Sequence, residues 1–132
     1  MKKIFCLLIA SASVLMCSCV TKVLVDSPES PMATYDDITH EFQGRVKASL
    51  SNVFKATNIA LERDLGFFRC GQIPKSGQWL IYARAKRDIQ MVVDLKDEGN
   101  GFVSITLSYG EDDLMLCQKL FKAIVNNLKN YQ

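Results

Sequence analysis

Apolar and polar residues alternate with a period of two along several short stretches of the chain, and this alternation predicts β-strands. Turn segments that contain glycine, such as residues 74–77 and 98–101, separate neighbouring stretches and favour hairpins. Each stretch has one apolar and one polar face, which is typical of an antiparallel sheet with one solvated side. The predicted strands are residues 42–50, 67–73, 78–86, 89–96 and 103–109.

Two further segments carry apolar residues at every third or fourth position, which predicts amphipathic helices. The first follows Ser51, an N-cap residue, and runs through Leu65 to Gly66, where it ends. The second begins near Asp112 and ends near Lys129, and its acidic start and later lysines suit the helix dipole. Each helix therefore has one stripe to bury against another element.

The predicted order of elements is β-α-β-β-β-β-α. Every strand has one apolar face and both helices have one apolar stripe. We therefore expect an α+β fold, a two-layer sandwich in which one antiparallel five-stranded sheet carries both helices on one face. The first strand runs opposite to the last, so these two can pair, and the expected strand order is 2-3-4-5-1.

The face of this sheet turned away from the helices is a candidate interaction face. It mixes tyrosine, arginine and aliphatic residues, and both tyrosine and arginine are enriched where proteins bind one another. The alternative is a solvated face with scattered apolar residues. The side chains expected on this face are Arg45, Lys47, Leu80, Tyr82 and Arg84, with Gln90, Val92 and Lys96 beside them.

The N-terminal segment has the layout of a secretory signal: two lysines, an apolar run at residues 4–16, then small residues and a cysteine. The run is shorter than the ~20 residues that a membrane-spanning helix needs. The Ser18-Cys19 junction resembles the lipobox of bacterial lipoproteins. This resemblance implies that residues 1–18 are a signal peptide and that the Cys19 thiol is acylated. Val20, where an Asp would imply the inner membrane, implies the outer membrane, facing the periplasm.

Two segments are expected after the signal. Residues 19–40 are predicted to be the lipidated cysteine and a flexible tether, because residues 26–31 are polar and contain two prolines. Residues 41–132 are predicted to be a single α+β domain. The chain has 16 Lys+Arg and 14 Asp+Glu, and the signal removes two lysines and no acid, so the remainder is formally neutral. Neutrality excludes nucleic acid as an expected partner.

Cys70 and Cys117 remain after the signal and the lipidated cysteine are set aside, and they form a candidate disulfide. Cys117 lies on the apolar stripe of the last helix. Arg69 is expected to face water, which would turn Phe68 and Cys70 toward the helices. The alternative is two buried thiols that act as small apolar residues.

Several short stretches resemble a family of short bacterial lipoproteins catalogued as a domain of unknown function. They are Ala60-Leu61 through Leu65-Gly66, Ala83-Arg84, and Ile105 to Gly110 before a terminal helix. The resemblance covers residues 42–128 and the anchor. It implies the location and the fold, and it brings no activity.

Residue patterns typical of catalysis are missing from the sequence. His40 is the only histidine and precedes a strand, where a solvated boundary residue is expected. No Cys/His cluster has metal-site spacing, and no nucleophile or phosphate-loop motif occurs. The acids around Gly99 lack the spacing of a calcium loop and are expected to form a solvated hairpin end. We therefore expect no enzyme and no cofactor.

The expected function is that of a lipid-anchored, non-catalytic module that binds an envelope protein or glycan. Two alternatives stay open. One is a binder of a small apolar ligand between sheet and helices, which needs an interior cavity above ~300 Å³. The other is an enzyme with an unrecognised site, which needs polar groups that converge in a cleft.

Overall fold

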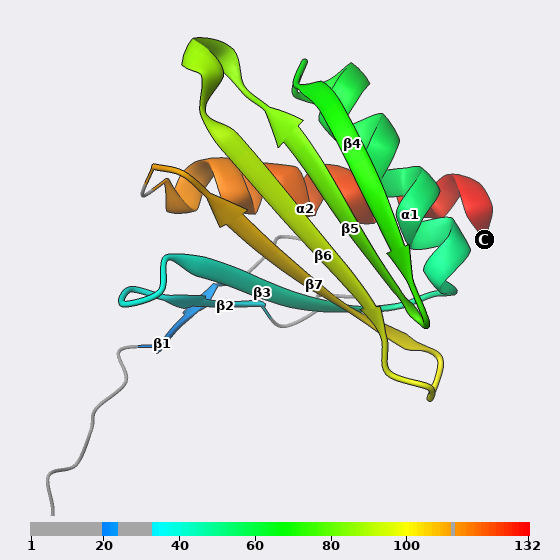
Figure 1. Cartoon of the computed structure of the whole chain (residues 1–132). Coiled ribbons are helices and arrows are strands. Elements are labelled where there is room, and N and C mark those ends of the chain that lie inside the picture. Colours follow the sequence, from blue (N-terminus) through cyan, green and yellow to red (C-terminus); the bar gives the residue numbers. More distant parts are fainter. Residues whose placement is uncertain (1–19, 24–32, 112) are drawn as a thin grey trace, which may run out of the picture.

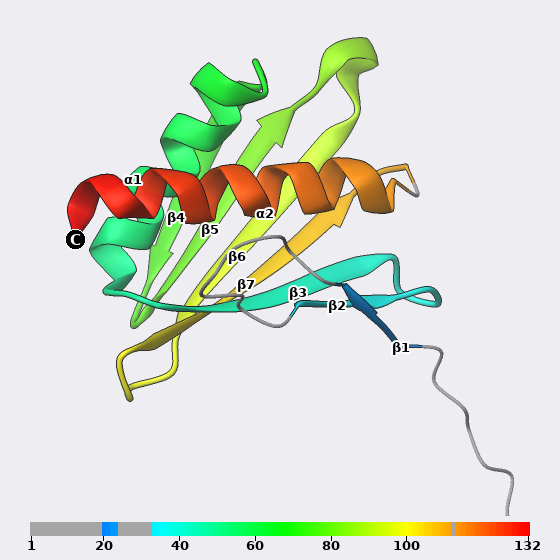
Figure 2. The same ribbon diagram turned by 180° about the vertical axis from the view of Figure 1, so that it is seen from behind.

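Seven strands form one antiparallel sheet, and two helices cover one of its faces (Figures 1 and 2). The computed structural model describes residues 20–23, 33–111 and 113–132. The strands are β1 Val20–Val23, β2 Ala33–Asp36, β3 Glu41–Lys47, β4 Phe68–Lys75, β5 Gln78–Arg84, β6 Gln90–Asp97 and β7 Phe102–Tyr109. Their order in the sheet is β1-β2-β3-β7-β6-β5-β4. The helices are α1 Leu50–Ile59, continued by a π-helical turn at Ala60–Asp64, and α2 Leu114–Leu128; short 3₁₀ turns occupy Lys86–Asp88 and Lys129–Tyr131.

The predicted α+β class, with one antiparallel sheet and both helices on one side, is confirmed. The five predicted strands correspond to β3, β4, β5, β6 and β7, and they lie in the predicted order. The predicted number of strands is wrong, because β1 and β2 extend the sheet beyond β3 to seven strands.

The extra strands come from the segment that was expected to be a flexible tether. β1 pairs with β2, and β2 pairs with β3, with Tyr35 opposite Phe42. Ala33 and Tyr35 are 1% and 3% exposed, so β2 belongs to the domain and not to a tether. The physical reason is the short alternation of apolar Ala33 and Tyr35 with polar Thr34 and Asp36. Residues 24–32, which include the two prolines, lie outside the described residues.

A tight turn joins β2 to β3. Asp36 Oδ1 accepts hydrogen bonds from the backbone N–H groups of Ile38 at 2.8 Å and Thr39 at 3.2 Å. These hydrogen bonds hold the pKa of Asp36 below its ordinary value of 3.8, because they stabilise the carboxylate. His40 closes the turn with a φ of 55° and is exposed, as expected for a boundary residue.

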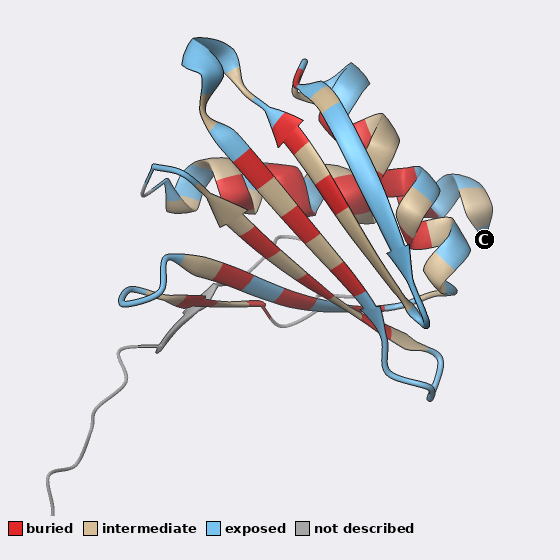
Figure 3. Cartoon of the chain, in the orientation of Figure 1, coloured by how far each residue is buried: buried red, intermediate tan, exposed pale blue. Residues whose placement is uncertain are grey.

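The core lies between the sheet and the two helices, and buried residues alternate with less buried ones along each central strand (Figure 3). Its closest approach is between β3 and α2. A Cβ at Gly44 would lie 2.2 Å from Phe121 Cε2, so this position needs glycine for the aromatic ring to fit. The Phe121 ring also packs on Phe42, with centroids 5.3 Å apart.

α1 begins two residues earlier than predicted. Ser49, not Ser51, is its N-cap, and the Ser49 Oγ accepts a hydrogen bond from the Asn52 backbone N–H at 3.3 Å. The helix ends in a wider π-helical turn, in which the Leu65 N–H donates to the Ala60 carbonyl at 3.0 Å. Gly66 follows with a φ of 68° and ends the helix where the sequence predicted.

A polar cluster joins the π-helical turn to α2. Asn127, which is 4% exposed, donates through Nδ2 to Asp64 Oδ2 at 2.7 Å and accepts from Arg63 Nη2 at 2.9 Å. Arg63 Nε also donates to Asp64 Oδ1 at 3.0 Å. The hydrogen bond from Asn127, and then the one from Arg63, hold the pKa of Asp64 below its ordinary value of 3.8.

Gly44→Ala should destabilise the domain by about 1–3 kcal/mol, because the new methyl group overlaps a fully buried ring. Urea unfolding of the wild type and the variant measures this loss. Gly71→Ala is the matched control, since a Cβ there meets nothing within 4 Å. Equal destabilisation by the two substitutions would contradict the close packing of β3 and α2.

Asn127→Ala should lower the free energy of unfolding by about 1 kcal/mol at neutral pH, because it removes a hydrogen bond to a carboxylate. Asp64 has a lowered pKa when folded, so its contribution is present above the unfolded pKa and is lost as pH falls through the folded pKa. The difference between wild type and Asn127→Ala should therefore shrink in acid. Asn126→Ala, on the exposed side of α2, should show no such pH dependence in urea unfolding. Parallel curves for the two variants would refute the link to Asp64.

Candidate functional site

The sheet face turned away from the helices, which we call the open face, carries every side chain predicted for the interaction face. Positions on β3, β5 and β6 that alternate with buried core residues point to this side (Figure 3). Tyr82, for example, lies opposite Val92, while its neighbours Ile81 and Ala83 are buried. The predicted residues that share the open face are Arg45, Lys47, Leu80, Tyr82, Arg84, Gln90, Val92 and Lys96. Their role in binding stays a prediction.

An apolar cluster occupies the part of the open face formed by β4, β5 and β6. Ile73 lies opposite Leu80, and Tyr82 lies opposite Val92. Ile73 is 45% exposed, and Phe68, at the start of β4, is 74% exposed. We define the apolar cluster as Phe68, Ile73, Leu80, Tyr82 and Val92. Large apolar side chains with this much exposure, grouped on one surface, are typical of contact sites.

Phe68 was not predicted for this face: the expectation that it faces the helices and that Arg69 faces water is wrong, because the part of β4 before Cys70 has the opposite orientation. Arg69 does not lie on the open face: it lies on the helix side of the sheet, where its Nε forms an ion pair with Glu62 at 3.0 Å. The register with β5 shifts just after Arg69 and leaves Cys70 as the extra residue of a β-bulge. Phe67, which is 9% exposed, fills the core position that was expected for Phe68.

The predicted disulfide between Cys70 and Cys117 is absent from the structure. Cys70 is exposed on β4, an edge strand, whereas Cys117 is 1% exposed on the buried side of α2. α2 packs over β3 and β7, while β4 touches only β5 and the π-helical turn closely. Two thiols can be bridged only when their Cα atoms lie within ~7 Å, and these two lie over different parts of the sheet.

Four cationic side chains lie at one end of the open face, next to the β4–β5 and β6–β7 hairpins. Strand register sets them in a row: Arg45 lies opposite Ser104, Ser104 opposite Lys96, and Lys96 opposite Gln78. The next position along this row is Lys75 on β4, and Lys47 follows Arg45 on β3. We define the basic margin as Arg45, Lys47, Lys75 and Lys96. Within the described residues, the three lysines form no ion pair.

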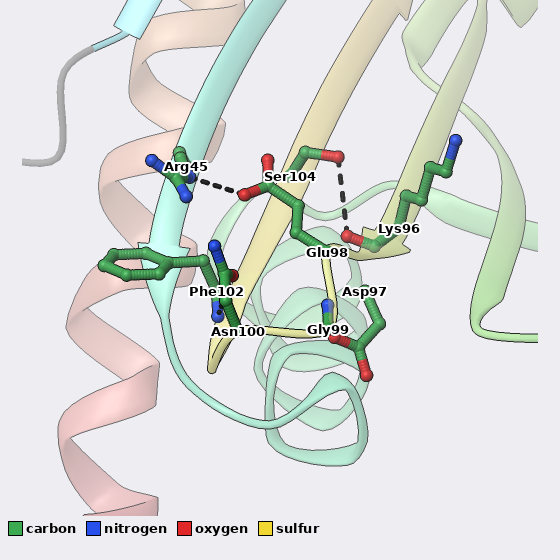
Figure 4. Close-up of polar contacts among 8 residues, drawn as sticks. All are labelled: Arg45, Lys96, Asp97, Glu98, Gly99, Asn100, Phe102 and Ser104. Carbon is green, nitrogen blue, oxygen red and sulfur yellow. Dashed lines mark hydrogen bonds and ion pairs between the residues drawn. The ribbon is translucent and has the colours of Figure 1, made fainter.

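Arg45 is the one member of the basic margin with a fixed position (Figure 4). Its Nε forms an ion pair with Glu98 Oε2 at 2.6 Å, and its guanidinium lies 4.2 Å from the centroid of the Phe102 ring. Both contacts orient the side chain over the β6–β7 hairpin. Phe102 and Glu98 are therefore part of the open face, although the sequence analysis did not place them there.

Of the acids near the β6–β7 hairpin, Asp97 bonds within the turn and Asp94 bonds across to β5. Asp97 Oδ1 accepts a hydrogen bond from the Gly99 N–H at 2.9 Å, and Asp94 Oδ1 accepts one from Gln78 Nε2 at 2.7 Å. This agrees with the expected solvated hairpin end. Among the residues that the structure describes, no group of three or more His, Cys, Asp or Glu side chains is placed to hold a metal ion.

Comparisons with known proteins identify no family for this chain. No protein-family model matches the sequence, and no curated protein matches it. The resemblance to short bacterial lipoproteins therefore stays a prediction. Cys19 lies outside the described residues, and the helices in the described part are too short or too polar to cross a membrane.

Proposed function

We propose that this chain is a lipid-anchored, non-catalytic binding module of the bacterial envelope, which holds a protein partner on its open face. The anchor is the acylated Cys19, and the location is the outer membrane, facing the periplasm. The observation that carries the proposal is the open face itself, where the apolar cluster and the basic margin lie side by side on a surface that no other part of the described chain covers.

The composition of the apolar cluster supports a protein partner. Tyr82 and Phe68 are aromatic, and Arg84 stands beside them on the same face. Tyrosine, phenylalanine and arginine are enriched at protein interfaces, where they contribute much of the binding energy. The aliphatic side chains of Leu80 and Val92 gain little from a sugar, which presents mainly hydroxyl groups, but they gain from an apolar partner surface.

The basic margin adds a charge preference. Its lysines have no ion-pair partner within the described chain, so acidic groups of a partner can approach them without first breaking a pair. Charges at the rim of an interface mainly steer the encounter and fix its orientation, while a central apolar cluster supplies affinity. A protein with an apolar patch beside acidic residues fits both halves of the open face.

The edge of β4 is a poor site for an added strand. Pro74 has no backbone N–H, and the bulge at Cys70 interrupts the regular ladder, so a partner strand would find few regular hydrogen-bond positions. We therefore assign binding to the side chains of the face and not to the edge.

The interior favours a surface function over a buried ligand. Large side chains with less than 2% exposure fill the layer between the sheet and the helices. They include Phe42, Leu61, Met91, Phe121 and Ile124.

Changing Tyr82 and Arg84 to Ala together should reduce partner capture about tenfold or more, because it removes an aromatic anchor and a cation. Capture is measured in cells as the yield of a cross-linked protein adduct from a photoreactive residue at Val92. Lys55→Ala with Lys122→Ala, on the solvent sides of α1 and α2, is the control, and it should leave the yield unchanged. Wild-type yield from the Tyr82 and Arg84 variant, with the fold retained, would refute the open face, and adducts with glycan alone would replace the protein partner.

Cys19→Ala should abolish fatty-acid incorporation and leave an unprocessed form that keeps residues 1–18 or a soluble form in the aqueous phase, because the acylated thiol is lost. Metabolic labelling with a palmitate analogue measures this. Cys17→Ala is the matched control and should be labelled like the wild type. Unchanged labelling in Cys19→Ala would show that the anchor lies elsewhere.

A further inference from the structure

β1 fixes where the lipid of Cys19 would attach to the domain. Val20, the residue after Cys19, lies opposite Asp36, and Asp36 lies opposite Glu41. Glu41 in turn lies opposite Ser108, near the end of β7. Neighbouring Cα atoms are about 3.8 Å apart, so an acylated Cys19 would lie at this end of the sheet with no tether between lipid and fold.

Two further connections reach the same end. The β5–β6 turn leads into Gln90, whose carbonyl accepts a hydrogen bond from the Gly110 N–H at 2.9 Å. Arg87 of that turn forms an ion pair with Glu111 at 3.6 Å, which ties the turn to the β7–α2 connection. We define the proximal end as the β2–β3 turn, the β5–β6 turn and the β7–α2 connection with the first residues of α2. In Figure 1 the β2–β3 turn and the start of α2 lie at the left, and the β5–β6 turn lies at the upper left.

The proximal end carries two of the four large apolar side chains that the described part of the chain exposes. Ile38 in the β2–β3 turn is 71% exposed, and Met115 in the first turn of α2 is 79% exposed. Hydrogen bonds hold the backbone at both positions. Asp36 accepts one from the Ile38 N–H, and Asp113 caps α2 by accepting one from the Leu116 N–H at 2.9 Å. A single exposed apolar residue needs no explanation, but two held outward at the anchored end do.

From this juxtaposition we propose that the proximal end lies against the membrane surface, with Ile38 and Met115 in the lipid interface. The proposal rests on the proposed lipid anchor. An apolar side chain on an exposed turn favours the boundary between headgroups and acyl chains. Two such side chains bind weakly alone, but the acyl chains of Cys19 make their contact intramolecular and raise its effective concentration.

The charge of the proximal end indicates whether electrostatic attraction to anionic lipid contributes to the proposed contact. Lys86 and Arg87 are the cations of the β5–β6 turn, but acidic residues outnumber them. The acids of this end are Asp36, Asp37, Asp88, Glu111 and Asp113. Attraction to anionic lipid is therefore not the basis of the contact, and salt should affect it little.

This orientation places the basic margin at the end of the sheet farthest from the lipid. β7 has 8 residues, which span roughly 25 Å at the rise of an extended strand. The basic margin lies at the far end of that length, with the β4–β5 and β6–β7 hairpins (Figure 1). A partner in the periplasm would meet the basic margin first, and the open face would be roughly perpendicular to the plane of the membrane.

The experiment uses the full-length chain, lipidated in cells, purified and placed in vesicles of phosphatidylethanolamine and phosphatidylglycerol. In a Cys70→Ser background, a fluorophore is attached to Ile38→Cys or Met115→Cys, and to Ser76→Cys or Asn100→Cys as distal controls; Cys117 is 1% exposed and stays unlabelled. Brominated lipids quench only fluorophores near the acyl chains. We expect several-fold stronger quenching at the two proximal positions, with little change on addition of salt.

Each outcome decides the proposal. Equal quenching at both ends, or stronger quenching at Ser76→Cys, overturns it, and so does loss of the contrast at high salt. Vesicle flotation is measured first on the same samples: protein that fails to float refutes the anchor, whereas protein that floats without end-specific quenching refutes only the orientation. Cross-linking between two copies through position 38, without quenching, would assign this end to a second copy.

An independent variant tests the apolar contact itself. Met115→Asp, on the solvent side of α2, should reduce quenching of a fluorophore at Ile38→Cys while flotation stays complete, because the acyl chains still hold the protein. Lys122→Asp on the same helix is the control and should leave the quenching unchanged. Equal quenching in both variants overturns the apolar basis of the contact.

Discussion

The contact between Gly44 and Phe121 sets how closely the two layers of this protein approach. The Phe121 ring occupies the space where a Cβ of residue 44 would lie, so α2 can pack directly on β3. Phe42, two residues before Gly44 on β3, packs on the same ring. α1 packs beside α2 over β6, and the hydrogen bonds of Asn127 to Asp64 and Arg63 join the two helices at the π-helical turn. Both helices therefore pack on the same face of the sheet.

Because both helices pack on one face, the opposite face is left uncovered and is available for the binding that we propose. With two helices and one sheet, the apolar residues of only one sheet face are buried, and the other face must be solvated or covered by a partner. The polar residues Ser104, Thr106 and Ser108 of β7 suit water. The apolar cluster on β4, β5 and β6 suits a partner better. Solvation alone does not explain why the β7 part of this face is polar while the part on β4, β5 and β6 is apolar.

The hydrophobic pattern was sufficient to predict the class of the fold, the five strands β3 to β7 and their order, because β3, β5, β6 and β7 alternate cleanly against a single core. It was insufficient where a local irregularity resets the alternation. The bulge at Cys70 reverses the faces of β4, turns Arg69 toward Glu62 and exposes Phe68. β2 was missed because four residues give little periodic signal and two prolines precede them. On the open face, residues 45, 47, 80, 82 and 84 followed from alternation alone, whereas Phe102 and Glu98 depend on the three-dimensional course of the hairpin.

The pairing of β1 with β2 changes what a lipid anchor would do. A flexible tether would let the domain take any orientation, and binding on the open face would then be independent of the membrane. If Cys19 is acylated as we propose, a strand that begins one residue later would remove that freedom, because Val20 lies opposite Asp36 at one end of the sheet. Ile38 and Met115 lie at that end, while Leu80 and Tyr82 lie on the open face, so the proposed lipid contact and the proposed partner contact would use different side chains. A domain anchored in this way could bind a partner without leaving the membrane, and the direction of the strands would set the direction from which the partner approaches.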